Sequence, residues 1–86
     1  MVWTLLVSIE VVHRLDSLAK AKRLNLLRHF EEIATFPENF TESVTTDDVG
    51  RRIEVSTHGE WLIFYWTDFS DPHVKILKLL KASEIV

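Results

Sequence analysis

The order of the predicted elements constrains this chain more than any single motif. Residues 2–9 alternate apolar side chains as a strand does, and they lead into an amphipathic helical stretch that ends near Pro37. A polar segment follows, and then come three strand-like runs, at residues 51–56, 61–67 and 73–80. This order predicts a single α+β domain over residues 1–86, connected β-α-α-β-β-β, with two helices packed on one face of a four-stranded, mainly antiparallel sheet.

The helical stretch divides into two parts. Apolar residues recur at helical spacing over residues 11–19 and again over residues 26–34. Asp16 and Ser17 interrupt the stretch near the end of the first part, and short polar side chains of this kind compete for backbone donors, which favours a break there. One long helix is the alternative, but we expect two helices, the second of which ends at Pro37.

The segments between the helices and the strands have distinct compositions. The first strand has one strongly apolar face, which predicts a strand that is internal to the sheet or covered on one face by helices: Trp3, Leu5, Val7 and Ile9. Residues 38–48 hold most of the hydroxyls and acids and are expected to form a surface loop. Residues 57–60, which include Gly59, and residues 68–72 are expected turns of an antiparallel meander.

Composition excludes several classes of function. There are no cysteines, which rules out disulfides, thiolate metal sites and a cysteine nucleophile. The net charge of −3 and the pI of about 5.7 argue against a general nucleic-acid binder, although residues 20–28 carry four cations and no acid. No run approaches the roughly 20 apolar residues that span a bilayer, and the start lacks a signal-peptide pattern, so we expect a soluble, cytoplasmic protein. The histidines show no metal-ligand spacing, and we expect neither metal nor cofactor.

The strand-like run at residues 61–67 has two apolar faces. Alternation places three residues on one face, namely Trp61, Ile63 and Tyr65, and three on the other, namely Leu62, Phe64 and Trp66. This pattern is typical of a covered central strand, so we interpret these aromatic residues as core rather than as a base-stacking platform. If one face of the sheet were left open, it would form a partner-binding patch.

Three lysines are spaced by three residues near the C-terminus. Strict alternation places Lys78 on the face of Val74 and Ile76, and it places Lys75 and Lys81 on the opposite face. A lysine within an apolar strand suggests a concave polar pocket or a strand edge, although its long stem can also reach solvent. Lys78 is therefore the polar position of greatest interest.

These features together resemble the RelE/ParE superfamily of small toxins from bacterial toxin–antitoxin pairs. Three stretches carry the resemblance: LLRHFEEIATFP, GRRIEVSTHGEWLIFYWTDF and HVKILKLLKA. They look like the second helix with its following proline, the strand–turn–strand unit that ends in a tyrosine, and the last core strand. The resemblance covers nearly the whole chain, and it rests on a pattern of apolar positions together with Gly59 and Tyr65.

The resemblance implies one of two activities. RelE-like toxins enter the ribosomal A site and cleave mRNA with Arg and Lys residues, whereas ParE-like toxins bind DNA gyrase and are not nucleases. Both are neutralised by an antitoxin that wraps the sheet and helices. RelE-like nucleases commonly carry an Arg three positions before the tyrosine matched by Tyr65, and this chain has Leu62 there.

Candidate site residues follow from this resemblance and from their chemistry. A metal-independent nuclease needs a base, an acid and cations near the phosphate, which gives six catalytic candidates: Arg51, Arg52, His58, Tyr65, Lys78 and Lys81. Five basic residues are the candidates for partner binding: Arg51, Arg52, Lys75, Lys78 and Lys81. An exposed turn is the simpler interpretation of His58, and solvated or locally paired strand positions that of Arg51 and Arg52.

The leading hypothesis is a toxin-like component of a type II toxin–antitoxin pair that acts by protein binding. Its expected partner is an antitoxin, and the acidic charge and Leu62 favour DNA gyrase over the ribosome and its mRNA as the target. One alternative is a metal-independent, ribosome-associated mRNA endonuclease. A second is a non-toxic interaction module of the same fold, and a homodimer is left open.

Overall fold

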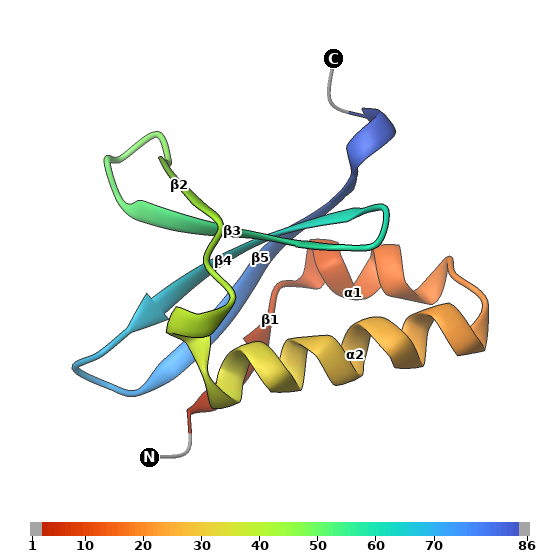
Figure 1. The fold of residues 1–86 in the computed structure, drawn as a ribbon, viewed down its shortest axis with the longest axis horizontal. Helices are drawn as coiled ribbons and strands as arrows, with labels where there is room; N and C mark the ends of the chain where they lie inside the picture. The colour runs from red at the N-terminus through yellow and green to blue at the C-terminus, as the bar shows by residue number, and fades with distance from the viewer. Residues whose placement is uncertain (1–2, 85–86) are drawn as a thin grey trace.

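The computed structural model describes residues 3–84 and shows a mixed sheet with two helices (Figure 1). In chain order the elements are β1 (Thr4–Val7), α1 (Ile9–Asp16), α2 (Lys20–Thr35), the 3₁₀ turn η1 (Pro37–Asn39), β2 (Ser43–Thr46), β3 (Arg52–His58), β4 (Trp61–Asp68), β5 (His73–Lys81) and the 3₁₀ turn η2 (Ala82–Glu84). The α+β class, the two helices and the closing meander are as the sequence predicts.

Over residues 3–84 the sheet has five strands rather than the predicted four. Its order is β1-β5-β4-β3-β2, with β1 parallel to β5 and all other neighbours antiparallel. The additional strand β2 lies within residues 38–48, where a surface loop was expected. All four of its residues are exposed, so it is held by its pairing with β3 and lacks the apolar alternation that reveals a strand.

The first strand was predicted to be either internal to the sheet or covered on one face by helices. It is an edge strand, and helices cover one of its faces. It pairs with β5 alone, and Leu5 and Val7 pack against the core. Ile9, predicted to share their face, instead begins α1 and is 70% exposed. The strand ends because Ser8 caps the helix: its hydroxyl accepts from the Val11 backbone N–H at 3.3 Å.

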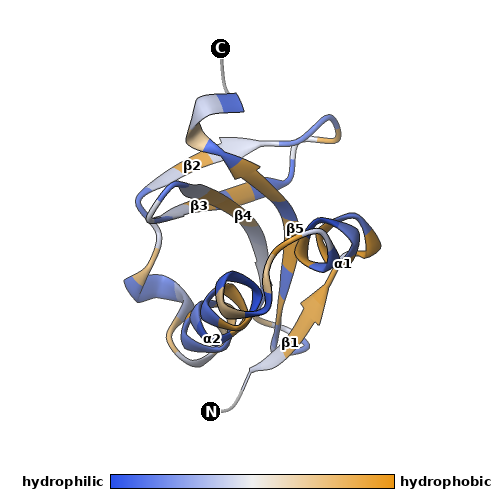
Figure 2. Cartoon of the chain, turned by 90° about the vertical axis from the view of Figure 1, so that its right-hand side faces the viewer, coloured by the Kyte–Doolittle hydropathy of each residue, from blue (hydrophilic) through white to orange (hydrophobic). Residues whose placement is uncertain are grey.

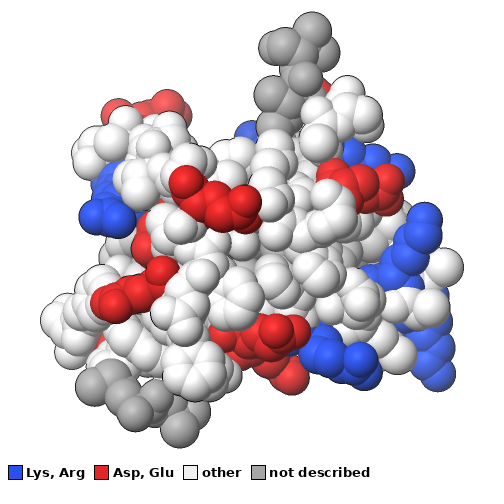
Figure 3. Space-filling model, viewed as in Figure 1, with Lys and Arg blue, Asp and Glu red and all other residues white. Residues whose placement is uncertain are grey.

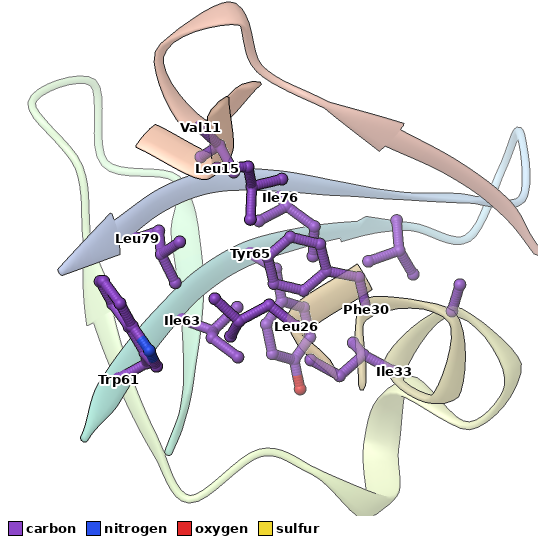
Figure 4. Close-up of a cluster of buried hydrophobic side chains, with 12 residues drawn as sticks. Val11, Leu15, Leu26, Phe30, Ile33, Trp61, Ile63, Tyr65, Ile76 and Leu79 are labelled. Atoms are coloured by element: carbon purple, nitrogen blue, oxygen red, sulfur yellow. The ribbon is translucent and has the colours of Figure 1, made fainter. Parts of the chain in front are cut away.

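The two helices are separate, as predicted, and both cover the same face of the sheet. The first helix ends at Asp16 and the second begins at Lys20. Between them, the Ser17 backbone N–H still donates to the Arg14 carbonyl at 3.2 Å. In Figure 2 the polar residues of α2 appear blue, and the apolar residues of β1 and β5 appear orange beside the helices. The buried cluster between the layers is shown in Figure 4 and includes Val11, Leu15, Leu26, Phe30, Ile33, Trp61, Ile63, Tyr65, Val74, Ile76 and Leu79.

A β-bulge interrupts the alternation in β5. Phe64 pairs with Lys78 and the next residue, Tyr65, pairs with Ile76, so two steps along β5 match one step along β4. Leu77 is the extra residue. Such a bulge cannot be read from the apolar sequence HVKILKLLK, in which either phase is acceptable.

The bulge makes the predicted face assignment of the lysines wrong. Lys78 is exposed on the face opposite the buried Val74, and Lys75 shares that face. Lys81 instead lies on the helix-covered face, where its Nζ stands 5.6 Å from the centroid of the Trp61 ring. The three lysines are therefore divided between the faces as two and one.

Candidate functional site

The face of the sheet opposite the helices is the candidate functional surface, and we name it the open face. Its residues alternate with those of the core, and most are only partly buried. Phe64 and Trp66 keep part of their surface accessible and Leu6 is 42% exposed, whereas the neighbouring Ile63 and Tyr65 on the other face are fully buried. The apolar residues of the open face are Leu6, Ile53, Val55, Leu62, Phe64, Trp66, Leu77 and Leu80.

A hollow of about 370 Å³ lies on the open face between β2 and β5. Its floor is apolar, and two of the predicted basic residues stand at its rim, Arg51 and Lys78. The floor is formed mainly by Ile53, Phe64 and Leu77. The hollow can therefore accept an apolar side chain of a partner while the rim contacts acidic or phosphate groups.

Arg51 is fixed in place by the turn that joins β2 to β3. Its Nε donates to Asp47 Oδ2 at 2.6 Å, and its guanidinium carbon stands 5.4 Å from the centroid of the Trp66 ring. Burial opposes ionisation of Asp47, but the bonds from Arg51 and from the Val49 backbone outweigh it and hold the Asp47 pKa below its usual range. The turn carries Gly50 at a φ of +83°, a conformation that suits glycine. Arg51 is thus a positioned cation that is partly neutralised.

Lys75 and Lys78 provide the other positive charges of the open face. Lys78 is exposed, and no acidic side chain among residues 3–84 forms an ion pair with it. Lys75 is half-buried between its strand neighbours Leu6 and Trp66. Apolar surface bordered by unpaired lysines is typical of a protein-binding surface.

The remaining candidates lie on the helix-covered face. Arg52 alternates with Glu54 on that face, and Lys81 borders Trp61. His58 stacks on His29, so it is not the simple exposed turn residue that was expected. The six catalytic candidates therefore do not converge: the hollow brings together only Arg51 and Lys78.

Tyr65, one of the catalytic candidates, is a buried structural residue. Its side chain is fully buried, its hydroxyl donates to the Pro37 carbonyl at 2.8 Å, and it lies 2.9 Å from Thr41 Oγ1. Burial raises the pKa of Tyr65 to about 12, so the hydroxyl stays protonated at neutral pH. Tyr65 therefore holds the turn η1 and Thr41, which lies between η1 and β2, against the centre of the sheet.

Sequence reasoning missed a pair of stacked histidines between α2 and β3. The rings of His29 and His58 lie 4.0 Å apart with an angle of 16° between them, and His58 Nε2 lies 2.6 Å from Asn25 Oδ1. His29 is 6% exposed, and its Nε2 has no hydrogen-bond partner among the described residues. The helical position of His29 beside Phe30 is the only signal in the sequence, and it does not reveal the stacking.

The similarity of this chain to known proteins is one of structure. No protein-family model and no curated protein sequence matches the chain. Among solved structures, the chain is similar to the crystal structure of the archaeal RelE–RelB complex from Pyrococcus horikoshii OT3, with a TM-score of 0.76 and 24% sequence identity. The alignment covers 94% of this chain and 96% of that one. The fold is RelE-like. The resemblance found in the sequence is thereby confirmed at the level of the fold.

None of the helices within residues 3–84 has the length and apolar character needed to cross a bilayer. Within the same residues, no three side chains of the ligand types His, Asp and Glu come together in a group able to hold a metal ion.

Proposed function

We propose that this chain is the toxin-like component of a type II toxin–antitoxin pair and that it acts in the cytoplasm by binding proteins through its open face. The observation that carries the proposal is a RelE-like fold over 94% of the chain. The similar structure is of a RelE–RelB complex, and we extend the partner class to this chain as an antitoxin polypeptide. The partly exposed apolar residues of the open face support a polypeptide partner.

The geometry supports protein binding better than RNA cleavage. Leu62, at the position where related nucleases carry an arginine, pairs with Leu80 and faces the same side as Phe64. An apolar surface therefore replaces a cation at that point of the open face. For the same reason we favour a protein target such as DNA gyrase over mRNA.

A specific observation favours a second candidate, the ribosome-associated mRNA endonuclease. Arg51 and Lys78 border one hollow, and two cations there could stabilise the charge of a phosphorane. The proposed acid–base residues His58 and Tyr65 lie on the other face, so this candidate needs a base supplied from elsewhere. The third candidate, a non-toxic interaction module, shares the binding surface and lacks the effect on growth.

Induction of the chain alone in a bacterial host distinguishes these candidates. Growth, the 5′ ends of transcripts and the DNA-damage response are followed together in one culture. Arrest with intact transcripts and an induced damage response is the expected result and indicates gyrase. Arrest with new cuts inside translated codons would establish the nuclease instead, and normal growth with abundant soluble protein would leave the interaction module.

A further inference from the structure

The sheet divides at one end into two hairpins. Pairing between β3 and β4 begins only at Glu54 and Tyr65. Before that point Arg52 and Ile53 pair with β2, and beyond it residues 66–68 pair with β5. Figure 1 shows the result: the turn between β2 and β3, at the upper left, and the turn between β4 and β5, at the lower left, lie apart. A cleft of about 290 Å³ opens between them.

A buried carboxylate lies at the base of this cleft. Glu54 is 8% exposed, its Oε1 accepts from the Thr41 hydroxyl at 2.8 Å, and its Oε2 accepts from the Thr67 hydroxyl at 2.5 Å. Buried carboxylates in proteins are generally paired with a cation. Within residues 3–84, no Lys, Arg or His nitrogen comes within 4.0 Å of Glu54. Two hydroxyls therefore orient the carboxylate, and its charge lacks a direct counterion.

The walls of the cleft suit a flat cation. The side chains of Trp66 and Phe69 line it, and Phe69 is 61% exposed. Aromatic rings attract cations, and the guanidinium group stacks on them more readily than an ammonium group does. The charged residues of the lining are Glu38, Glu54 and Arg52, so acids outnumber bases there by two to one.

We propose that this cleft binds the guanidinium group of an arginine side chain supplied by a partner polypeptide. The planar fork of N–H donors meets the Glu54 carboxylate, while Trp66 and Phe69 cover the faces of the group. Arg52 stands at the rim of the cleft and competes electrostatically with the incoming cation. The Arg51 guanidinium, whose carbon lies 5.4 Å from the Trp66 ring centroid, competes with it for that ring. The site is distinct from the hollow of the open face, and the inference goes beyond the proposed function because it does not require that the chain stop growth.

The test is a ¹H–¹⁵N NMR titration of the 86-residue chain with the peptide Gly-Gly-Arg-Gly-Gly, acetylated and amidated at its ends. We expect saturable shifts of the Trp66 indole N–H and of the Thr41 and Thr67 backbone N–H. The matched peptide with citrulline in place of arginine keeps the shape and lacks the charge, and it is expected to cause no shifts. Equal shifts from citrulline, or shifts confined to Phe64 and Leu77 on the open face, would overturn the proposal.

Two variants separate binding from folding. Glu54→Gln is expected to weaken binding by about tenfold or more, since it removes a charge-assisted bond. Glu54 also accepts hydrogen bonds from Thr41 and Thr67, so its substitution could disturb the fold. The second variant is therefore Arg52→Gln, because Arg52 is exposed. This change removes a competing cation and is expected to tighten binding. Unchanged or weaker binding by Arg52→Gln would contradict the assignment. Ethylguanidinium chloride is the small-molecule probe, and the absence of shifts at Trp66, Thr41 and Thr67 on its addition would overturn the assignment of the cleft to a guanidinium group.

Discussion

The two faces of the sheet are made by alternate residues of the same strands, and they differ in what they contribute. On the helix-covered face Ile63, Tyr65 and Ile76 are fully buried. On the open face Phe64 and Leu77, their immediate neighbours in the chain, remain partly accessible. Burial of apolar surface stabilises the fold on the first face and leaves the second free for a partner. Substitutions on the two faces should therefore affect different measurements.

The largest effect is expected from truncation within the helix-covered face. Phe30 is fully buried in α2, and Phe30→Ala should lower the free energy of unfolding by about 3–5 kcal/mol through lost burial and a residual cavity. Urea unfolding followed by circular dichroism measures the change. Leu24→Ala in the same helix is the control, because Leu24 is 46% exposed and its loss should cost less than about 1 kcal/mol. Equal losses for the two variants would contradict the assigned core.

Tyr65→Phe should have an intermediate effect. The change keeps the ring in the core and removes the hydroxyl that donates to the Pro37 carbonyl. Leaving that buried group without its donor should cost about 1–3 kcal/mol. The same urea experiment measures it, and the loss of protection of backbone amides in η1 by hydrogen exchange would locate it. An unchanged unfolding free energy would show that this bond does not hold the turn.

Protonation of His29, which lies on the helix-covered face, should lower the free energy of unfolding gradually as the pH falls. Burial lowers the pKa of His29 below its usual 6.5, His58 lowers it further, and Glu32 and Glu42 act in the opposite direction. Well above pH 6.5 His29 is neutral in both the folded and the unfolded chain and contributes nothing to the pH dependence. As the pH falls through 6.5 the unfolded chain takes up the proton first, so stability falls with the pH until the folded chain is protonated as well.

The His29→Phe variant isolates this contribution. Urea unfolding at a series of pH values from 7.5 downwards should give a flatter pH dependence for the variant than for the unchanged protein. The comparison uses the slope rather than the absolute stability, because the new ring also changes packing. Identical slopes would show that protonation of His29 is not linked to unfolding.

Much of the fold could be predicted from the sequence because its signals are local. The helices show apolar residues at helical spacing, Pro37 ends the second one, and Gly59 supports the turn between β3 and β4. Strand β2 was not predicted, because its hydroxyl side chains give it no apolar face. Only its pairing with β3 makes it a strand. The bulge at Leu77 was not predicted, because both phases of β5 are apolar.

The candidate site was predictable only in part for the same reason. The basic residues were identifiable by type, but the distribution of the three β5 lysines between the faces depends on the bulge. Lys75 and Lys78 belong to the open face together with Arg51, whereas Arg52 and Lys81 do not. The Glu54 cleft depends on where pairing between β3 and β4 begins, a long-range property that no local pattern of residues reveals.

The smallest effect on stability, and the largest on function, is expected at Lys78. Because Lys78 is exposed, Lys78→Glu should change the unfolding free energy by less than about 0.5 kcal/mol. Lys22→Glu is the matched control: Lys22 is exposed near the start of α2 and does not line the hollow. In Figure 3 most of the visible Lys and Arg residues gather at the right of the molecule, at the end where α1 connects to α2. Both variants carry the same change of charge.

The most direct test of the account compares growth after induction of the unchanged chain, Lys78→Glu and Lys22→Glu at equal soluble levels. If the open face binds the target, the unchanged chain and Lys22→Glu should arrest growth and Lys78→Glu should not. Arrest by Lys78→Glu together with normal growth of Lys22→Glu would place function on the helix side and contradict the account. Normal growth with all three proteins would contradict the toxin-like role itself.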